Sequence, residues 1–92
     1  MAEGIGGKNY EFVAREIADG YVFVNQLYLK KFTQDVLKKL LVAVNKTINN
    51  IRNEKYAAGD FVAIKSRNIR LTRLNNAAMV IKYFAKDRRW LI

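Results

Sequence analysis

The sequence predicts an α/β fold, a two-layer sandwich in which two helices pack on a small sheet. Two short runs rich in β-branched and aromatic residues, 21–24 and 61–64, have the composition of strands. Each run precedes a longer segment in which apolar residues recur at three- and four-residue steps, as in amphipathic helices. Strands that alternate with helices are typical of an α/β sandwich, and the predicted element order is (β)-β-α-β-α-(β).

The N-terminal part of the chain is the least determined. Residues 1–8, which include three glycines, are predicted to form a flexible tail, and residues 9–92 a single domain. The segment 10–17 fits both an edge strand and a helix, because its apolar residues satisfy both spacings. Asp19 and Gly20 form a turn signal before the first predicted strand. If 10–17 is a strand, the two strands form a hairpin around this turn.

The two predicted helices follow the two predicted strands. The first spans about 29–48 and fades into a polar stretch, and a turn at 58–60 leads to the strand 61–64. That strand is apolar almost throughout, as in strands covered on both faces. A loop at 65–68 leads to the second helix, whose apolar stripe ends at Phe84, and the last three residues form a short strand or an apolar anchor.

The composition excludes several classes of chemistry. The 92 residues contain no cysteine and no histidine, so disulfides, thiolate metal sites and the commonest general base are absent. The carboxylates are scattered, and the glycines near the N-terminus lack the residues of a phosphate-binding loop. No apolar run approaches the roughly 20 residues that span a bilayer. The sequence therefore predicts a protein that is not an enzyme, needs no cofactor or metal, and has no membrane partner.

Positive charge is distributed unevenly along the chain. The formal net charge is +9, with two basic and four acidic residues in 1–28 and fifteen basic and four acidic residues in 29–92. A polyanion is the natural partner of such a surface, because neutralising phosphates releases counterions. The alternative is that the lysines only keep the protein soluble. With no signal-peptide pattern, the sequence predicts a cytoplasmic protein associated with the nucleoid or chromatin.

Basic residues gather where the second predicted strand would end and the second helix would begin. Free N–H groups at a helix start favour phosphate oxygens, and guanidinium groups bind phosphate in a fork. A lysine pair lies near the start of the first predicted helix. An arginine pair precedes Trp90, which would stack on a base, form an apolar plug over the sheet, or make a subunit contact. The alternative is a solvated surface. The predicted nucleic-acid-binding residues are Lys65, Arg67, Asn68, Arg70, Arg73, Lys30, Lys31, Arg88 and Arg89.

The stretch 62–74, VAIKSRNIRLTRL, with the apolar rhythm that follows it, resembles the Alba family of small basic chromatin and RNA-binding proteins. Upstream, 22–25 and the helix from Tyr28 resemble the family's first strand and first helix. The resemblance implies a β-α-β-α domain that forms a homodimer and binds duplex DNA or RNA with little sequence preference. The β-hairpin that closes the family's domain has no counterpart after the second predicted helix.

Some of the family's binding positions have counterparts here. Lys65 and Arg67 match the basic loop after the second strand, and Asn68 stands where the family has glycine. Lys30 and Lys31 fall near the family's lysine pair before the first helix. The sequence thus favours a non-enzymatic nucleic-acid-binding protein that contacts mainly the phosphate backbone, with DNA and RNA both open. The alternative is an assembly subunit of a ribonucleoprotein or viral particle.

Overall fold

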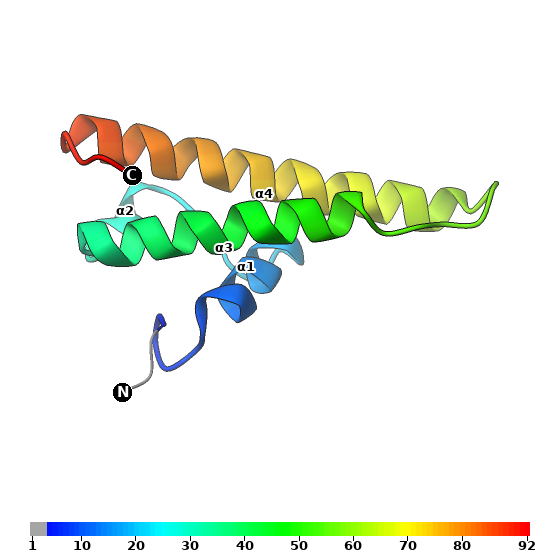
Figure 1. Ribbon diagram of the computed structural model, residues 1–92, viewed down its shortest axis with the longest axis horizontal. Coiled ribbons are helices and arrows are strands. Elements are labelled where there is room, and N and C mark those ends of the chain that lie inside the picture. The colour runs from blue at the N-terminus through cyan, green and yellow to red at the C-terminus, as the bar shows by residue number, and fades with distance from the viewer. Residues whose placement is uncertain (1–3) are drawn as a thin grey trace.

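The structure, a computed structural model, describes residues 4–92 and is a bundle of helices (Figure 1). In chain order the helices are α1 (Tyr10–Ala18), α2 (Gln26–Leu29), α3 (Gln34–Arg52) and α4 (Phe61–Asp87). α3 and α4 run antiparallel as a long hairpin, and α1 packs against both. The short α2 also packs on α4, near the end at which α4 finishes.

The predicted α/β sandwich is wrong. Within residues 4–92 the only β pairing is an isolated bridge between Ile5 and Lys8. The segment predicted as the first strand, 21–24, has no regular secondary structure, and 61–64 forms the first turn of α4. A short apolar run cannot be assigned to a strand or a buried helix by periodicity alone. The β-α-β-α domain implied by the resemblance is therefore not the fold of this chain.

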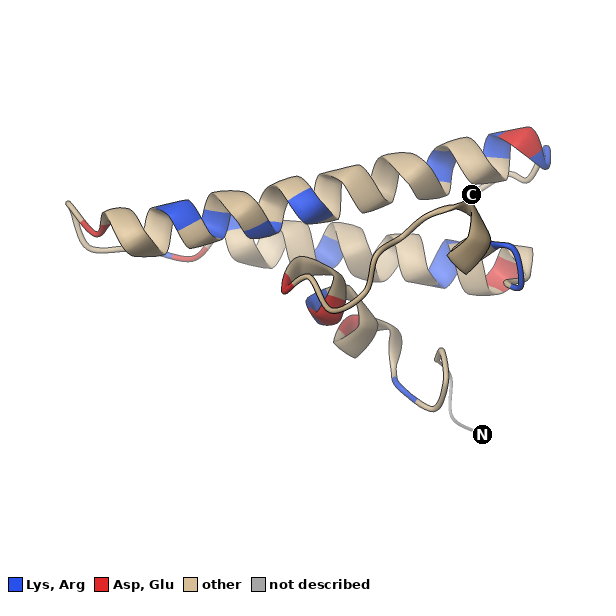
Figure 2. Ribbon diagram, turned by 180° about the vertical axis from the view of Figure 1, so that it is seen from behind, with Lys and Arg blue, Asp and Glu red and all other residues tan. Residues whose placement is uncertain are grey.

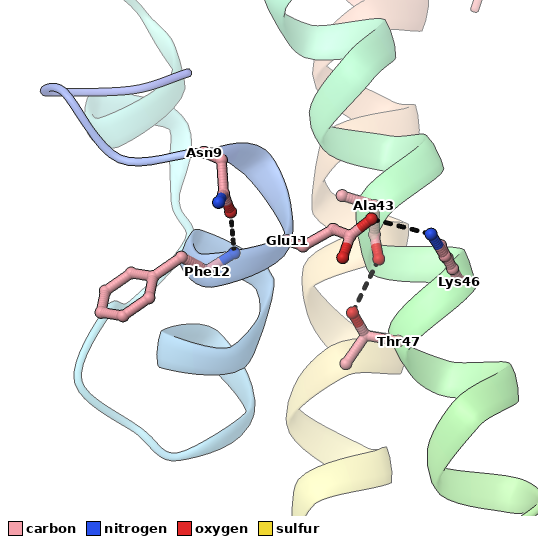
Figure 3. A network of polar contacts seen from close by, with 6 residues as sticks. All are labelled: Asn9, Glu11, Phe12, Ala43, Lys46 and Thr47. Atoms are coloured by element: carbon pink, nitrogen blue, oxygen red, sulfur yellow. Dashed lines mark hydrogen bonds and ion pairs between the residues drawn. The ribbon is translucent and has the colours of Figure 1, made fainter. Parts of the chain in front are cut away.

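Polar caps explain why helices begin where they do. The Asp60 side chain accepts a hydrogen bond from the Ala63 N–H at 3.1 Å, which starts α4 at Phe61 instead of leaving a strand there. Asn9 caps α1 in the same way, by accepting from the Phe12 N–H at 2.7 Å (Figure 3). The ambiguous segment 10–17 is thus helical, and the hairpin around residues 19 and 20 does not form.

The predicted helices are correct in type but not in extent. The segment 29–48 is divided, because Thr33 caps a new helix by accepting from the Val36 N–H at 3.3 Å. α3 then continues to Arg52, four residues beyond the predicted end. α4 contains the whole of the second predicted helix together with the predicted loop 65–68.

The predicted N-terminal tail is described only in part. Residues 1–3 lie outside the described residues. In the remainder, the main-chain groups of Ile5 and Lys8 exchange hydrogen bonds of 2.8 and 3.1 Å. The Lys8 ammonium lies 3.0 Å from a carboxylate oxygen of Glu16, so it also contacts α1.

The core lies where α1, α3 and the second half of α4 meet. Its fully buried side chains are aliphatic, as expected for a small bundle with one apolar stripe per helix. The largest are Leu29, Leu37, Leu40, Val44, Leu74 and Ile81. On α1 the buried positions are Val13, Ala14, Ile17 and Ala18.

The two halves of α4 have different environments. All six of its buried residues lie between Leu74 and Ala85, and none lies in 61–73. The first half begins beyond the end of α3, beside the connecting segment 53–60 (Figure 1). α4 therefore offers one covered half and one half with much of its side-chain surface in solvent.

Candidate nucleic-acid interface

The predicted binding residues fall into two groups that lie far apart on the bundle (Figure 2). We call the first the proximal cluster, which lies on the first half of α4. The second is the distal cluster, which lies where α4 ends and α3 begins. Between the two groups, 74–81 carries no charged residue. The proximal cluster is Lys65, Arg67, Asn68, Arg70 and Arg73, and the distal cluster is Lys30, Lys31, Arg88 and Arg89.

The proximal cluster is not at a helix start, contrary to the sequence prediction. α4 begins at Phe61, so Lys65 and Arg67 lie inside the helix and not in a loop. Main-chain N–H groups inside a helix are already bonded to carbonyls four residues earlier, so they are not available to phosphate. The true start is capped by Asp60, whose negative charge disfavours an anion there. The prediction that free N–H groups of a helix start assist phosphate binding here is therefore wrong. The charge of the basic side chains alone then supports phosphate binding at this cluster.

Arg70 is held by the connecting segment before α4. Its Nη2 donates to Glu54 Oε1 and to the Tyr56 hydroxyl, both at 3.3 Å. The Tyr56 hydroxyl in turn donates to Glu54 Oε1 at 2.8 Å, and this bond raises the Tyr56 pKa. The hydrogen bonds among these three side chains hold the segment 53–60 against α4. Arg70 therefore has a structural role that the sequence did not indicate.

Arg73 and Arg67 also lie against other parts of the bundle. Arg73 Nη1 donates to the main-chain carbonyl of Ala18 at 3.0 Å. Arg67 is half-buried, and its Nε is buried without a hydrogen-bond partner among the described residues. Asn68 is exposed, and its main-chain carbonyl accepts from the Thr72 hydroxyl at 2.9 Å. Lys65 is thus the one basic side chain of the proximal cluster that is exposed and has no hydrogen-bond or ion-pair partner among the described residues.

The distal cluster is assembled by the tertiary structure. Lys30 and Lys31 lie in the turn between α2 and α3, and Arg88 and Arg89 follow α4. Gln34 Nε2, in the first turn of α3, donates to the Leu91 carbonyl at 3.1 Å and so joins the two segments across 57 positions. In the sequence these residues form separate groups, whereas the fold brings them to one end of the bundle (Figure 2).

The chain folds back after α4 in a defined way. Arg89 adopts a left-handed backbone conformation with φ of 59°, and the Trp90 N–H donates to the Ala85 carbonyl at 2.8 Å. The Arg88 guanidinium lies 4.5 Å from the centre of the Phe84 ring and 5.4 Å from that of Trp90. Trp90 is half-buried, with its ring edge-on to Phe84 at 6.2 Å. Of its predicted roles, this packing fits the apolar plug, which covers the end of α4 and not a sheet.

Two further basic residues lie at the distal end, and the sequence analysis did not select them. Lys82 and Lys86 occupy the last two turns of α4, and they line the same shallow surface as Arg89 and Trp90. Their four-residue spacing near the end of an apolar stripe was the available signal. In the part of the chain that the structure describes, no carboxylate pairs with Lys30, Lys31, Lys82, Lys86 or Arg89.

Acidic residues offset little of this charge. Asp35 begins α3 and lies 3.3 Å from the Lys39 ammonium, and Asp87 ends α4. Besides these two carboxylates, the distal end carries six basic residues: Lys30, Lys31, Lys82, Lys86, Arg88 and Arg89. The distal end therefore carries the largest group of unpaired cations in residues 4–92.

Comparison with known proteins finds no relative. No protein family, no characterised protein and no solved structure matches this chain. Among the described residues, no group of His, Cys, Asp or Glu is placed to hold a metal ion. In the same residues, none of the helices has the length and apolar character needed to cross a membrane.

Proposed function

We propose that this chain is a non-enzymatic nucleic-acid-binding protein that contacts the phosphate backbone with low sequence preference. The contact surface is the distal cluster together with Lys82 and Lys86. The observation that supports the proposal is the set of basic side chains at this end for which residues 4–92 supply no carboxylate partner. Cations that no carboxylate neutralises are available to phosphates, and counterion release then drives association. We expect such a protein to be associated with the nucleoid or chromatin.

The surroundings of Lys30 and Lys31 favour anions. Both residues are exposed and precede the start of α3 at Gln34. The first turn of a helix carries partial positive charge, which adds to that of the two lysines. Lys86, in the last turn of α4, offsets the partial negative charge of that helix end. At the distal end the two lysines thus lie beside the positive start of α3, and Lys86 offsets the negative end of α4.

A salt-series titration tests the proposal with duplex DNA, duplex RNA and single strands of equal length. Each phosphate contact contributes about 0.9 to the slope of log affinity against log salt. The double variant Lys30→Gln/Lys31→Gln is therefore expected to lower the slope by about 1.8 and the affinity roughly 10- to 100-fold at 0.1 M salt. Comparison of the three substrates decides between DNA and RNA.

The matched control removes the same charge from the proximal cluster. The variant Lys65→Gln/Arg67→Gln also loses two positive charges, so the long-range field falls equally in both variants. We expect it to keep most of the affinity. Equal losses in the two variants would show that only total charge matters and would remove the assignment to the distal end. No duplex binding by the unaltered chain at low salt would refute the function itself.

A further inference from the structure

The outer face of the first half of α4 carries a shallow, open depression of about 540 Å³ between its side chains, which we call the proximal groove. Apolar side chains of Phe61, Ile64 and Ile69 line it, together with the cations Lys65 and Arg73. Among residues 4–92, no carboxylate lines it. The groove thus joins an apolar floor to a positively charged border.

Much of this face is open to solvent in the described part of the chain. Phe61 is 78% exposed, Val62 is 82% exposed and Ile69 is 43% exposed. The inner face of α4, from Leu74 onward, is buried in the core, so α4 carries apolar residues on two opposite sides. A helix that is apolar on more than one side is normally covered on more than one side. Exposed apolar side chains grouped on one face are a feature of interaction surfaces.

The charge of α4 decides against a second copy of this chain as the occupant. α4 contains six Lys and Arg residues and one Asp, so two copies paired along this face would repel each other. Nucleic acid is also a poor fit to the groove. Surfaces that bind single strands present several aromatic rings for base stacking. Within the described residues, Phe61 is the single aromatic residue that lines this groove, beside Ile64 and Ile69.

We propose that the proximal groove docks an amphipathic helix of a partner protein whose apolar stripe is flanked by Asp or Glu. An apolar stripe with residues three and four apart would pack on Phe61 and Ile69, as in other helix-in-groove complexes. The acidic residues would face Lys65 and Arg73. Arg73 donates to the Ala18 carbonyl through Nη1, so its remaining N–H groups can donate to a carboxylate. This inference concerns a different surface from the proposed nucleic-acid site and does not rest on it.

The length of the groove sets the length of the partner helix. From Phe61 to Thr72, which also lines the groove, α4 rises about 17 Å at 1.5 Å per residue. Three turns of a partner helix match this span and present three or four apolar side chains to it. A partner helix of this size leaves the second half of α4 and the distal end uncovered.

Two defined peptides test the proposal by fluorescence anisotropy with the full chain. Both are 18-residue helical peptides with leucines at positions i, i+3, i+4 and i+7. One carries glutamates beside the leucines, and the other carries lysines at the same positions. We expect the acidic peptide to bind at least tenfold more tightly than the basic one. We also expect Phe61→Ser/Ile69→Ser to lower the affinity for the acidic peptide at least tenfold.

A control variant distinguishes the groove from general stickiness. Leu27→Ser/Val42→Ser removes two other exposed apolar side chains, 79% and 63% exposed, that lie outside the groove. It should leave peptide affinity unchanged. Because Phe61 and Ile69 are not buried, circular dichroism should show the same helix content in both variants. Equal peptide affinity in the two variants would overturn the proposal, and so would equal affinity for the two peptides.

Light scattering and an oligothymidine titration test the other two occupants. A dimer that Phe61→Ser/Ile69→Ser dissociates would show that a second copy fills the groove, and the proposal would be wrong. Oligothymidine binding that is lost in the same variant, with no peptide binding, would also overturn it. A monomer that binds the acidic peptide through the groove, with duplex binding still sensitive to Lys30→Gln/Lys31→Gln, would support two separate sites.

Discussion

Arg73 Nη1 lies 3.0 Å from the main-chain carbonyl oxygen of Ala18 and donates a hydrogen bond to it. This bond joins the end of α1 to the middle of α4, across 55 positions of sequence. Gly20 has a φ of 85° and lies against the same guanidinium, because a Cβ there would be 3.1 Å from Arg73 Cζ. Arg73 therefore contributes to the packing between two helices, whether or not it also binds a ligand.

We expect Arg73→Ala to lower the free energy of unfolding by about 1 to 2 kcal/mol, because it removes a charge-assisted hydrogen bond from a partly buried carbonyl. Urea denaturation measures this change. Lys65→Ala is the control, since Lys65 is exposed on the same helix, and it should change the stability by less than about 0.5 kcal/mol. If both variants lose the same stability, the bond to Ala18 contributes nothing to the fold.

The two halves of α4 should respond differently to truncation. Leu74 is fully buried, so Leu74→Ala should cost about 2 to 5 kcal/mol through lost burial and a residual cavity. Phe61 is 78% exposed, so Phe61→Ala should change the unfolding free energy by less than about 0.5 kcal/mol. Chemical denaturation of both variants checks the contrast. A large loss in Phe61→Ala would mean that the first half of α4 is covered in the free protein.

A surface ion pair links α1 to α3 and makes stability depend on pH. Lys46 Nζ lies 2.8 Å from Glu11 Oε1 (Figure 3), and this bond lowers the Glu11 pKa below its ordinary value of 4.5. Because the folded state has the lower pKa, the stabilisation is present above pH 4.5 and is lost as the pH falls further. The pair is exposed, so the effect is small and weakens with salt.

Glu11→Gln measures this contribution directly. Its unfolding midpoint in urea should lie below that of the unaltered chain at pH 7, and the two midpoints should converge below pH 4. Lys46→Gln should behave in the same way, because it removes the same pair. A difference between Glu11→Gln and the unaltered chain that persists unchanged at pH 3 would contradict an origin in the carboxylate charge.

Arg70 should matter for the connecting segment and little for nucleic acid. Its guanidinium is engaged by Glu54 and Tyr56, so Arg70→Gln should speed hydrogen exchange in 53–60 and leave duplex affinity nearly unchanged. Hydrogen-exchange mass spectrometry and the salt-series titration measure the two effects. A loss of duplex affinity as large as that of Lys30→Gln/Lys31→Gln would return Arg70 to the binding site.

Trp90 is a direct reporter of the distal end, because it is the only tryptophan of the chain. It is half-buried against Phe84 and covered by the Arg88 guanidinium, so it should stay in place when duplex binds nearby. Its emission maximum and its quenching by acrylamide should therefore not change on saturation with duplex. Strong quenching by the nucleic acid itself would show base stacking and would reject the plug role.

Of the candidate site, only the excess of positive charge and the grouping of basic residues could be predicted from the sequence. The excess of Lys and Arg after residue 28 was visible in the sequence, and so was each basic pair. What their partners would be was not visible. Arg70 meets Glu54 and Tyr56 by way of the connecting segment, and Arg73 meets Ala18 by way of the packing of α1. Lys30 and Arg89, 59 positions apart, reach one end of the bundle only through the α3–α4 hairpin.

The sequence by itself determined the amphipathic character of the long segments, the lack of His and Cys chemistry, and the uneven charge. These properties are local or compositional, so no neighbour can change them. Only the tertiary structure decided whether 21–24 and 61–64 are strands, because a strand needs a second strand beside it to satisfy its main-chain groups. In this chain Asp60 caps a helix that begins at 61. This helix determines which of the basic residues that follow make packing contacts and which are exposed to solvent.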